Sequence, residues 1–195
     1  MRTEFEFGQL VAAGLRVVDA DQGSLLLAEP DSKTLRFALV ADRNGAAVPS
    51  GAAASLVGRT IPIGSGITGM AALTRDVQAS SGSEAGGIPF HRVRGDGAPH
   101  AVLAAPLLAG ETLLGVLTAV RFNRRKTFSP ENARAYGIFA NLAAGILESA
   151  NRFPSPDPVR DGTSRLLSDI ATFVRDRPDR LAALRGILDA LLSLP

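Results

Sequence analysis

Both histidines of the chain, His91 and His100, lie within residues 78–100, a long stretch of loop-like composition. Loops of this length inside compact domains are usually functional or disordered. Two histidines without a cysteine do not make a closed zinc site, so we expect no bound metal. The carboxylates are scattered and no nucleophile elbow accompanies the histidines, so a Ser-His-Asp set is not supported either. We therefore predict a protein that is not an enzyme and holds no cofactor.

The composition excludes several further classes of chemistry. The 195 residues include no cysteine, which rules out thiol nucleophiles, disulfides and iron–sulfur ligation by this chain alone. The 21 basic and 19 acidic residues give a net charge of only +2, too small for a strong positive field. We interpret the one basic cluster, Arg121 with residues 124–126, as a solvated loop rather than a nucleic-acid groove. Neither a membrane span nor a signal peptide is evident, so we expect a cytoplasmic protein that binds neither nucleic acid nor membrane.

Residues 64–69, GSGITG, formally match the glycine pattern G-x-G-x-x-G of dinucleotide-binding proteins. That fingerprint also needs a βαβ unit and an acidic residue at the end of the next strand, about 20 residues on. Here the following helix, about residues 70–75, is brief, and Glu84 lies in a Ser- and Gly-rich segment that cannot be a buried parallel strand. We interpret the glycines as a tight turn into a short helix.

The strongest pattern of secondary structure lies in residues 101–152. The apolar runs AVLAAPLL and LLGVLTAVRF, separated by AGET, predict a β-hairpin in which Pro106 occupies an edge or a bulge. The segment that follows predicts a long helix with Ser129 as N-cap and Pro130 at the first helical position. Its capping box is expected to be incomplete, because Asn132 holds the position of the usual Glu or Gln.

The long helix carries apolar residues on two sides. One side would face the sheet and contains Tyr136, Phe139, Ala140, Ala143, Leu147 and Ala150. The other contains Ile138, Leu142, Gly145 and Ile146. A single sheet would not cover both sides, so we expect a second partner surface, against the alternative of a helix wrapped by its own domain. A predicted N-terminal helix of about residues 5–18, which includes Leu10, is the natural neighbour.

Taken together, these segments resemble a GAF domain, a small-molecule sensing module of phytochromes, phosphodiesterases and bacterial regulators. The resemblance covers about residues 5–152. It is carried by LVAAGLRVVDADQGSLLLAE, by VGRTIPIGSGITGMAALTRD, and by AVLAAPLLAGETLLGVLTAVRFN with FSPENARAYGIFANLAAGILESA. It implies an α+β, PAS-related fold: a central antiparallel sheet, helices packed on one face, a ligand pocket under loops on the other, and frequent dimerisation through terminal helices.

The resemblance also indicates candidate ligand-binding residues. In GAF domains the segment that corresponds to residues 78–100 closes over the ligand, which implies that Phe90, His91, Arg92 and His100 line the pocket. Thr118, on the second strand of the hairpin, is a further candidate. The alternative for the loop residues is a surface loop that touches nothing.

Three branches of the family fit the sequence less well. Nucleotide-binding members carry an Asn-Lys pair and then a Phe followed by Asp-Glu; Asn123 and Phe128 match, but Arg124 replaces the lysine and residues 132–133 are Asn-Ala. A GAF-type methionine sulfoxide reductase needs redox cysteines, and covalent bilin attachment usually needs one. A histidine could be a haem ligand, as in some GAF gas sensors, but we expect no haem.

The end of the domain is marked by prolines at positions 154, 156 and 158, which stop the long helix and predict an extended linker over residues 153–162. Residues 163–195 predict a helical tail of two short helices. Their apolar seams need a partner, which could be the chain's own domain, a second copy or another regulator. The expected interface residues are Leu10, Ile138, Leu142, Ile146, Leu184, Leu188 and Leu191.

The sequence thus predicts a GAF-like domain over residues 1–152, a linker over 153–162 and a tail over 163–195. The predicted function is that of a non-catalytic, bacterial-type regulatory module. It would bind a small molecule and signal to a regulatory partner through its terminal helices, as a homodimer. The alternative is a structural dimerisation or adaptor protein that has the fold but no physiological ligand.

Overall fold

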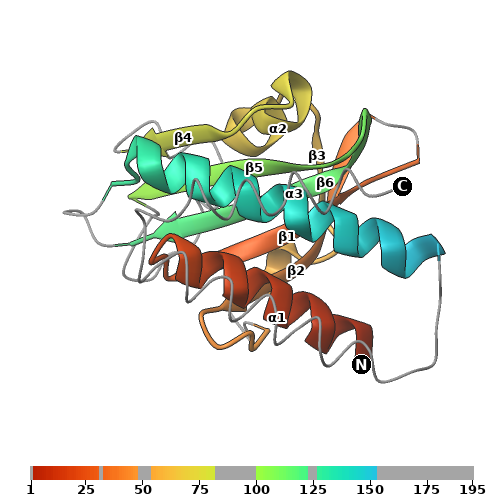
Figure 1. The fold of residues 1–195 in the computed structure, drawn as a ribbon, viewed down its shortest axis with the longest axis horizontal. Helices are drawn as coiled ribbons and strands as arrows, with labels where there is room; N and C mark the ends of the chain where they lie inside the picture. The colour runs from red at the N-terminus through yellow and green to blue at the C-terminus, as the bar shows by residue number, and fades with distance from the viewer. Residues whose placement is uncertain (1, 31–32, 48–53, 82–99, 123–126, 153–195) are drawn as a thin grey trace, which may run out of the picture.

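The computed structural model describes residues 2–30, 33–47, 54–81, 100–122 and 127–152. Within them, a six-stranded antiparallel sheet has the strand order β3-β2-β1-β6-β5-β4 (Figure 1). The strands are β1 Gln22–Ala28, β2 Thr34–Asp42, β3 Thr60–Pro62, β4 Gln78–Ser81, β5 Ala101–Ala109 and β6 Thr112–Arg121. The helices are α1 Arg2–Val17, α2 Gly66–Thr74 and α3 Pro130–Arg152, with a single 3-10 turn, η1, at Ala54–Leu56.

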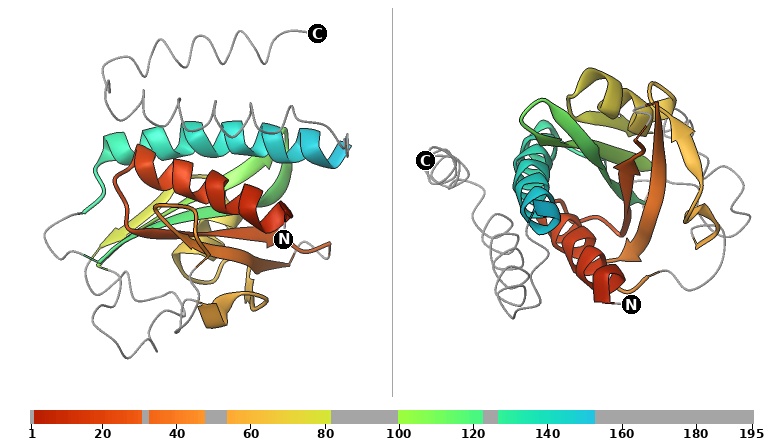
Figure 2. Two further views of the ribbon diagram at one scale, coloured as in Figure 1. Left: turned by 90° about the horizontal axis from the view of Figure 1, so that it is seen from below. Right: turned by 90° about the vertical axis from the view of Figure 1, so that its right-hand side faces the viewer.

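The helices divide between the two faces of the sheet (Figure 2). Helices α1 and α3 lie side by side on one face and enclose the larger apolar cluster, here called the first core. The short α2 and η1 lie on the opposite face and enclose the second core. The expected α+β, GAF-like fold is confirmed, with the two long helices together on one face as predicted.

The alternation of side chains along the strands explains why β5 reads as an unbroken apolar run. Leu103, Ala105 and Leu107 point into the first core. Val102 and Ala104 point into the second core. Successive residues of a strand face opposite sides, and both sides of this strand are covered, so neither set can be polar without a partner.

The strand β4 was not expected from the sequence. Residues Gln78–Ser81 pair with Ala101–Ala104 at the edge of the sheet, although they fall in the segment that we predicted to be loop. Their side chains are alternately half-buried and exposed, so no apolar alternation marks them. Because β4 covers only this part of β5, Pro106 lies where β5 has no partner in β4, in agreement with its predicted edge position.

The start of α3 has a complete capping box, and the prediction of an incomplete one was wrong. The Ser129 hydroxyl accepts a hydrogen bond from the Asn132 amide at 3.2 Å. The Asn132 side-chain oxygen in turn accepts one from the Ser129 amide at 3.1 Å. Asparagine is one methylene shorter than glutamine, but it still reaches. The pKa of Glu131, in the first turn of α3, is lowered. The larger cause is a hydrogen bond between its carboxylate and the Ser129 side chain, and the smaller is a hydrogen bond from the backbone amide of Glu131 itself.

As far as Leu147, the face of α3 that was predicted to contact the sheet is buried as expected, and it also contacts α1. Tyr136 and Phe139 are at most 2% exposed, and their stacked rings have centroids 6.4 Å apart. Gly14 of α1 lies against both rings: a Cβ added there would be 2.8 Å from Phe139 Cε1 and 3.1 Å from Tyr136 Cε2. The missing side chain therefore allows α1 to approach α3 closely.

Replacing Gly14 with alanine tests this contact. Overpacking of a core costs about 1–3 kcal/mol, while alanine gains up to about 1 kcal/mol over glycine in a helix. We expect Gly14→Ala to lower the free energy of unfolding by about 1–2 kcal/mol in urea denaturation. The control is Gly145→Ala in α3, where an added Cβ meets nothing among the described residues within 4 Å; it should raise stability by about 0.5–1 kcal/mol. Equal effects at both glycines would contradict the close approach.

Candidate functional site

The sheet face that carries the second core holds a buried pair of hydroxyl groups. Thr118 of β6, predicted above as a ligand-binding residue, is 1% exposed and Ser24 of β1 is fully buried. Their hydroxyl oxygens are 2.6 Å apart, and the Ser24 amide donates to Thr118 Oγ1 at 3.0 Å. The pair lies in a row across the sheet between the apolar residues Val40 and Ala104. Two hydroxyls in contact use one of their two protons between them, so the other remains available to an acceptor.

Further hydroxyls lie on the same side of the sheet. Ser80 of β4 pairs in register with Val102, a residue of the second core. Its hydroxyl oxygen is buried and has no hydrogen-bond partner among the described residues. Thr68 of α2 is 2% exposed. Over the described part of the chain, the buried polar side chains on this side are therefore all uncharged hydroxyls in apolar surroundings.

The other predicted ligand residues are placed only in part. His100 immediately precedes β5, is half-buried, and donates its amide hydrogen to the Arg121 carbonyl at 2.8 Å. It therefore extends the pairing of β5 with β6. Phe90, His91 and Arg92 lie outside the described residues, and their role stays a prediction.

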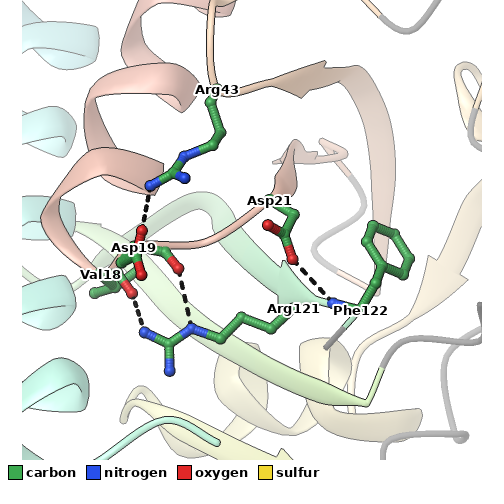
Figure 3. A network of polar contacts seen from close by, with 6 residues as sticks. All are labelled: Val18, Asp19, Asp21, Arg43, Arg121 and Phe122. Atoms are coloured by element: carbon green, nitrogen blue, oxygen red, sulfur yellow. Dashed lines mark hydrogen bonds and ion pairs between the residues drawn. The ribbon is translucent and has the colours of Figure 1, made fainter. Parts of the chain in front are cut away.

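A buried arginine joins both long helices to the sheet, at the end of β6. Arg121 Nε donates to the Asp19 carbonyl at 3.1 Å, and a second nitrogen donates to the Val18 carbonyl (Figure 3). Its third nitrogen donates to the carbonyl of Thr127. The guanidinium carbon also lies 4.2 Å from the centre of the Phe128 ring. Arg121 is only 7% exposed, so its assignment to a solvated loop was wrong. It connects the end of α1, the end of β6 and the segment that leads into α3.

Two carboxylates near this arginine balance its charge. Burial lowers the pKa of the Arg121 guanidinium, and the negative charges of Asp19 and Asp21 oppose that shift. The Asp19 carboxylate pairs with Arg43, and Asp21 Oδ2 accepts a hydrogen bond from the Phe122 amide at 3.0 Å (Figure 3). Asp19 has a φ of 51°, a left-handed conformation that aspartate tolerates better than most residues. The turn after α1 is thus shaped around the guanidinium.

The predicted interface residues fall into three groups. Leu10 is 5% exposed and belongs to the first core of its own chain, so it offers little surface to a partner. Ile138, Leu142 and Ile146 are half-buried on α3. Of these, Ile146 packs against the first core, whereas Ile138 and Leu142 appear in neither core. Leu184, Leu188 and Leu191 lie outside the described residues.

Comparison with known proteins places this arrangement in a family. The GAF domain family model matches residues 3–148, and the chain belongs to that family. GAF domains are sensory and regulatory modules. No curated protein sequence matches the chain. No helix in the described residues is long and apolar enough to cross a membrane.

Solved structures share the fold. The second GAF domain of DevS from Mycobacterium smegmatis is 24% identical, with a TM-score of 0.57, over 77% of this chain and 97% of that one. The PixJ GAF domain of Thermosynechococcus elongatus, in its blue-light absorbing form, is 14% identical, with a TM-score of 0.55, over 77% and 88%. The free methionine-R-sulfoxide reductase of Neisseria meningitidis is 19% identical, with a TM-score of 0.52, over 69% and 71%. At these identities the similarity concerns the fold alone.

Replacement of Arg121 tests its role at the junction of the helices and the sheet. Arg121→Met keeps an unbranched apolar side chain but leaves the three carbonyls without their donor. Hydrogen bonds to charged groups contribute about 1.5–3 kcal/mol each and are not additive, so we expect the free energy of unfolding to fall by about 3 kcal/mol. The control is Arg36→Met, which breaks the ion pair of the 44% exposed Arg36 with Glu29 and should cost no more than about 1 kcal/mol. Similar losses for the two variants in urea denaturation would show that Arg121 has no special role.

Proposed function

We propose that this chain is a cytoplasmic, non-catalytic sensory module that binds a small molecule on the α2 side of its sheet. In this proposal it signals to a regulatory partner through its long helices, as a homodimer. The observation that supports it most directly is the set of buried hydroxyls, Ser24, Thr118 and Ser80, on an otherwise apolar face. Ligand sites are typically apolar with a few placed polar groups. The Ser80 hydroxyl has no hydrogen-bond partner among the described residues, so it can donate to an acceptor on a ligand.

The chemistry of this face favours an uncharged ligand. The second core is built from aliphatic residues and Phe37, and a charge buried there would be unpaired at a high cost in free energy. The proton left over in the Ser24–Thr118 pair and the Ser80 hydroxyl can both be donated to an acceptor. We infer a mainly apolar small molecule that carries a carbonyl or ether oxygen. Phe128, half of the partial nucleotide motif, instead packs on Arg121, which weakens the case for a cyclic nucleotide.

The strand β6 offers a route from this face to the helices. Thr118 and Arg121 lie on the same strand but on opposite faces of the sheet. A displacement of β6 caused by a ligand at Thr118 would move the Arg121 guanidinium, which holds the end of α1 and the segment before α3. Both helices would then shift relative to the sheet, and a partner bound to them would sense the change.

The reductase among the structural neighbours does not alter the proposal that the chain has no catalytic activity. A redox mechanism based on thiols needs cysteine, and this sequence has none. The alternative function is a structural dimerisation or adaptor protein in which the hydroxyl face holds no ligand. The two functions differ in whether the purified protein binds a small molecule.

Native mass spectrometry of the full chain, followed by a thermal-shift panel of small uncharged metabolites, tests the ligand proposal. A ligand at one hundred times its Kd stabilises a protein by about 2.7 kcal/mol, which raises Tm by roughly 5–10 °C for a chain of this size. With the best compound, Thr118→Val should weaken binding about tenfold. The control is Thr112→Val, at an exposed position at the start of the same strand, and it should leave Kd unchanged. No retained molecule and no shift would favour the adaptor function.

A further inference from the structure

One side of α3 carries apolar residues that the described residues cover only in part. Ile138, Leu142 and Ile146 follow one another at intervals of four and form one line along the helix, here called the outer stripe. Ile138 and Leu142 belong to neither core. Beside them, Gly145 is exposed, with nothing among the described residues within 4 Å of an added Cβ. The outer stripe is therefore an apolar line that the described residues leave partly uncovered.

The chain immediately beyond α3 supplies a candidate for that helix. Prolines at 154, 156 and 158 predict that the helical path of α3 does not continue through this segment. Two amphipathic segments follow, each too short to be a stable helix alone in water. Their apolar positions are Leu166, Leu167, Ile170 and Val174 in the first, and Leu181, Leu184, Leu188 and Leu191 in the second.

The second of these segments is long enough to cover the outer stripe. At a rise of about 1.5 Å per residue, residues 138–146 span about 12 Å and residues 179–193 would span roughly 21 Å. The linker, residues 153–162, is long enough to let the chain turn back along α3. A segment tethered in this way has an effective concentration of about a millimolar. A second copy of the protein at micromolar concentration would need a much higher affinity to displace it.

We propose that residues 163–195 dock as amphipathic helices on the outer stripe of α3 in the same chain. The occupant is the chain's own tail, held there by its apolar seams. While the tail is docked, the outer stripe is closed to a second copy, so the tail controls homodimerisation through α3. That last consequence rests on the proposed function, whereas the docking itself does not.

Because the sequence has no cysteine, crosslinking can locate the tail without background reaction. The full chain carries Leu142→Cys with either Leu188→Cys or Leu167→Cys, and reacts with a short bismaleimide at micromolar concentration. The control pair is Val57→Cys with Leu188→Cys, since Val57 is 48% exposed beside η1 on the other face of the sheet. Intact mass spectrometry of a mixture of ¹⁴N- and ¹⁵N-labelled protein separates bridges within a chain from bridges between chains.

We expect at least one Leu142 pair to bridge within the chain, with a yield at least tenfold above the control and independent of concentration. Hybrid ¹⁴N/¹⁵N species as the main product would overturn the proposal and assign the outer stripe to a second copy. A yield no higher than that of the control for both pairs would also overturn it, because the outer stripe would then be uncovered.

A second full-chain variant, Leu184→Asp with Leu188→Asp, separates the docking from the dimer. If the tail blocks α3, light scattering should show at least a tenfold tighter monomer–dimer equilibrium in this variant than in the parent chain. If the cysteine pairs bridge within the chain but this variant stays a monomer, the docking is supported and the homodimer is contradicted. If the crosslinking fails, the ligand proposal is not affected, because the thermal-shift panel tests it separately.

Discussion

The structure depends on one buried guanidinium, that of Arg121. A charge removed from water lowers stability unless it is fully hydrogen-bonded, and the bonds come from backbone carbonyls of Val18, Asp19 and Thr127. Because these carbonyls flank the two long helices, satisfying one side chain fixes where α1 ends and where the chain turns into α3. The nearby carboxylates of Asp19 and Asp21 keep the positive charge favourable. The same side chain thus fixes the positions of the helix ends and is the centre of the local charge balance.

The two helices are also fixed to each other. The contact of Gly14 with the rings of Tyr136 and Phe139 leaves no room for a side chain, and close-packed interiors transmit displacement rather than absorb it. A shift of either helix therefore moves both. Thr118 on one face of β6 and Arg121 on the other give this pair of helices a short mechanical connection to the second core. The sheet thus separates the candidate ligand face from the signalling helices while joining them through a single strand.

How far the sequence predicts this structure depends on the range of the interactions. The hairpin and the buried side of α3 are encoded in local apolar periodicity. Along β6, Thr118 lies on the same face as Val116 and Val120, whereas Leu114 packs against the first core. The strand β4 was missed because an edge strand with half-exposed side chains needs no apolar pattern. The burial of Arg121 was missed because its partners at Val18 and Asp19 are distant in sequence. They are also backbone carbonyls, which every residue type has, so the residue types do not reveal them. Ser24 was missed as the partner of Thr118 for the same reason of distance.

The state of the hydroxyls determines which of them could select a ligand. Thr118 and Ser24 already bond to each other, so a ligand that displaced this bond would gain only the difference between two similar interactions. The proton left over in the pair can be donated without breaking that bond. Ser80 has no partner among the described residues, so a ligand acceptor there would relieve the free-energy cost of an unpaired buried group. Ser80 should therefore contribute more to affinity, and the Ser24–Thr118 pair, held rigid between β1 and β6, more to orientation and to the signal that β6 carries.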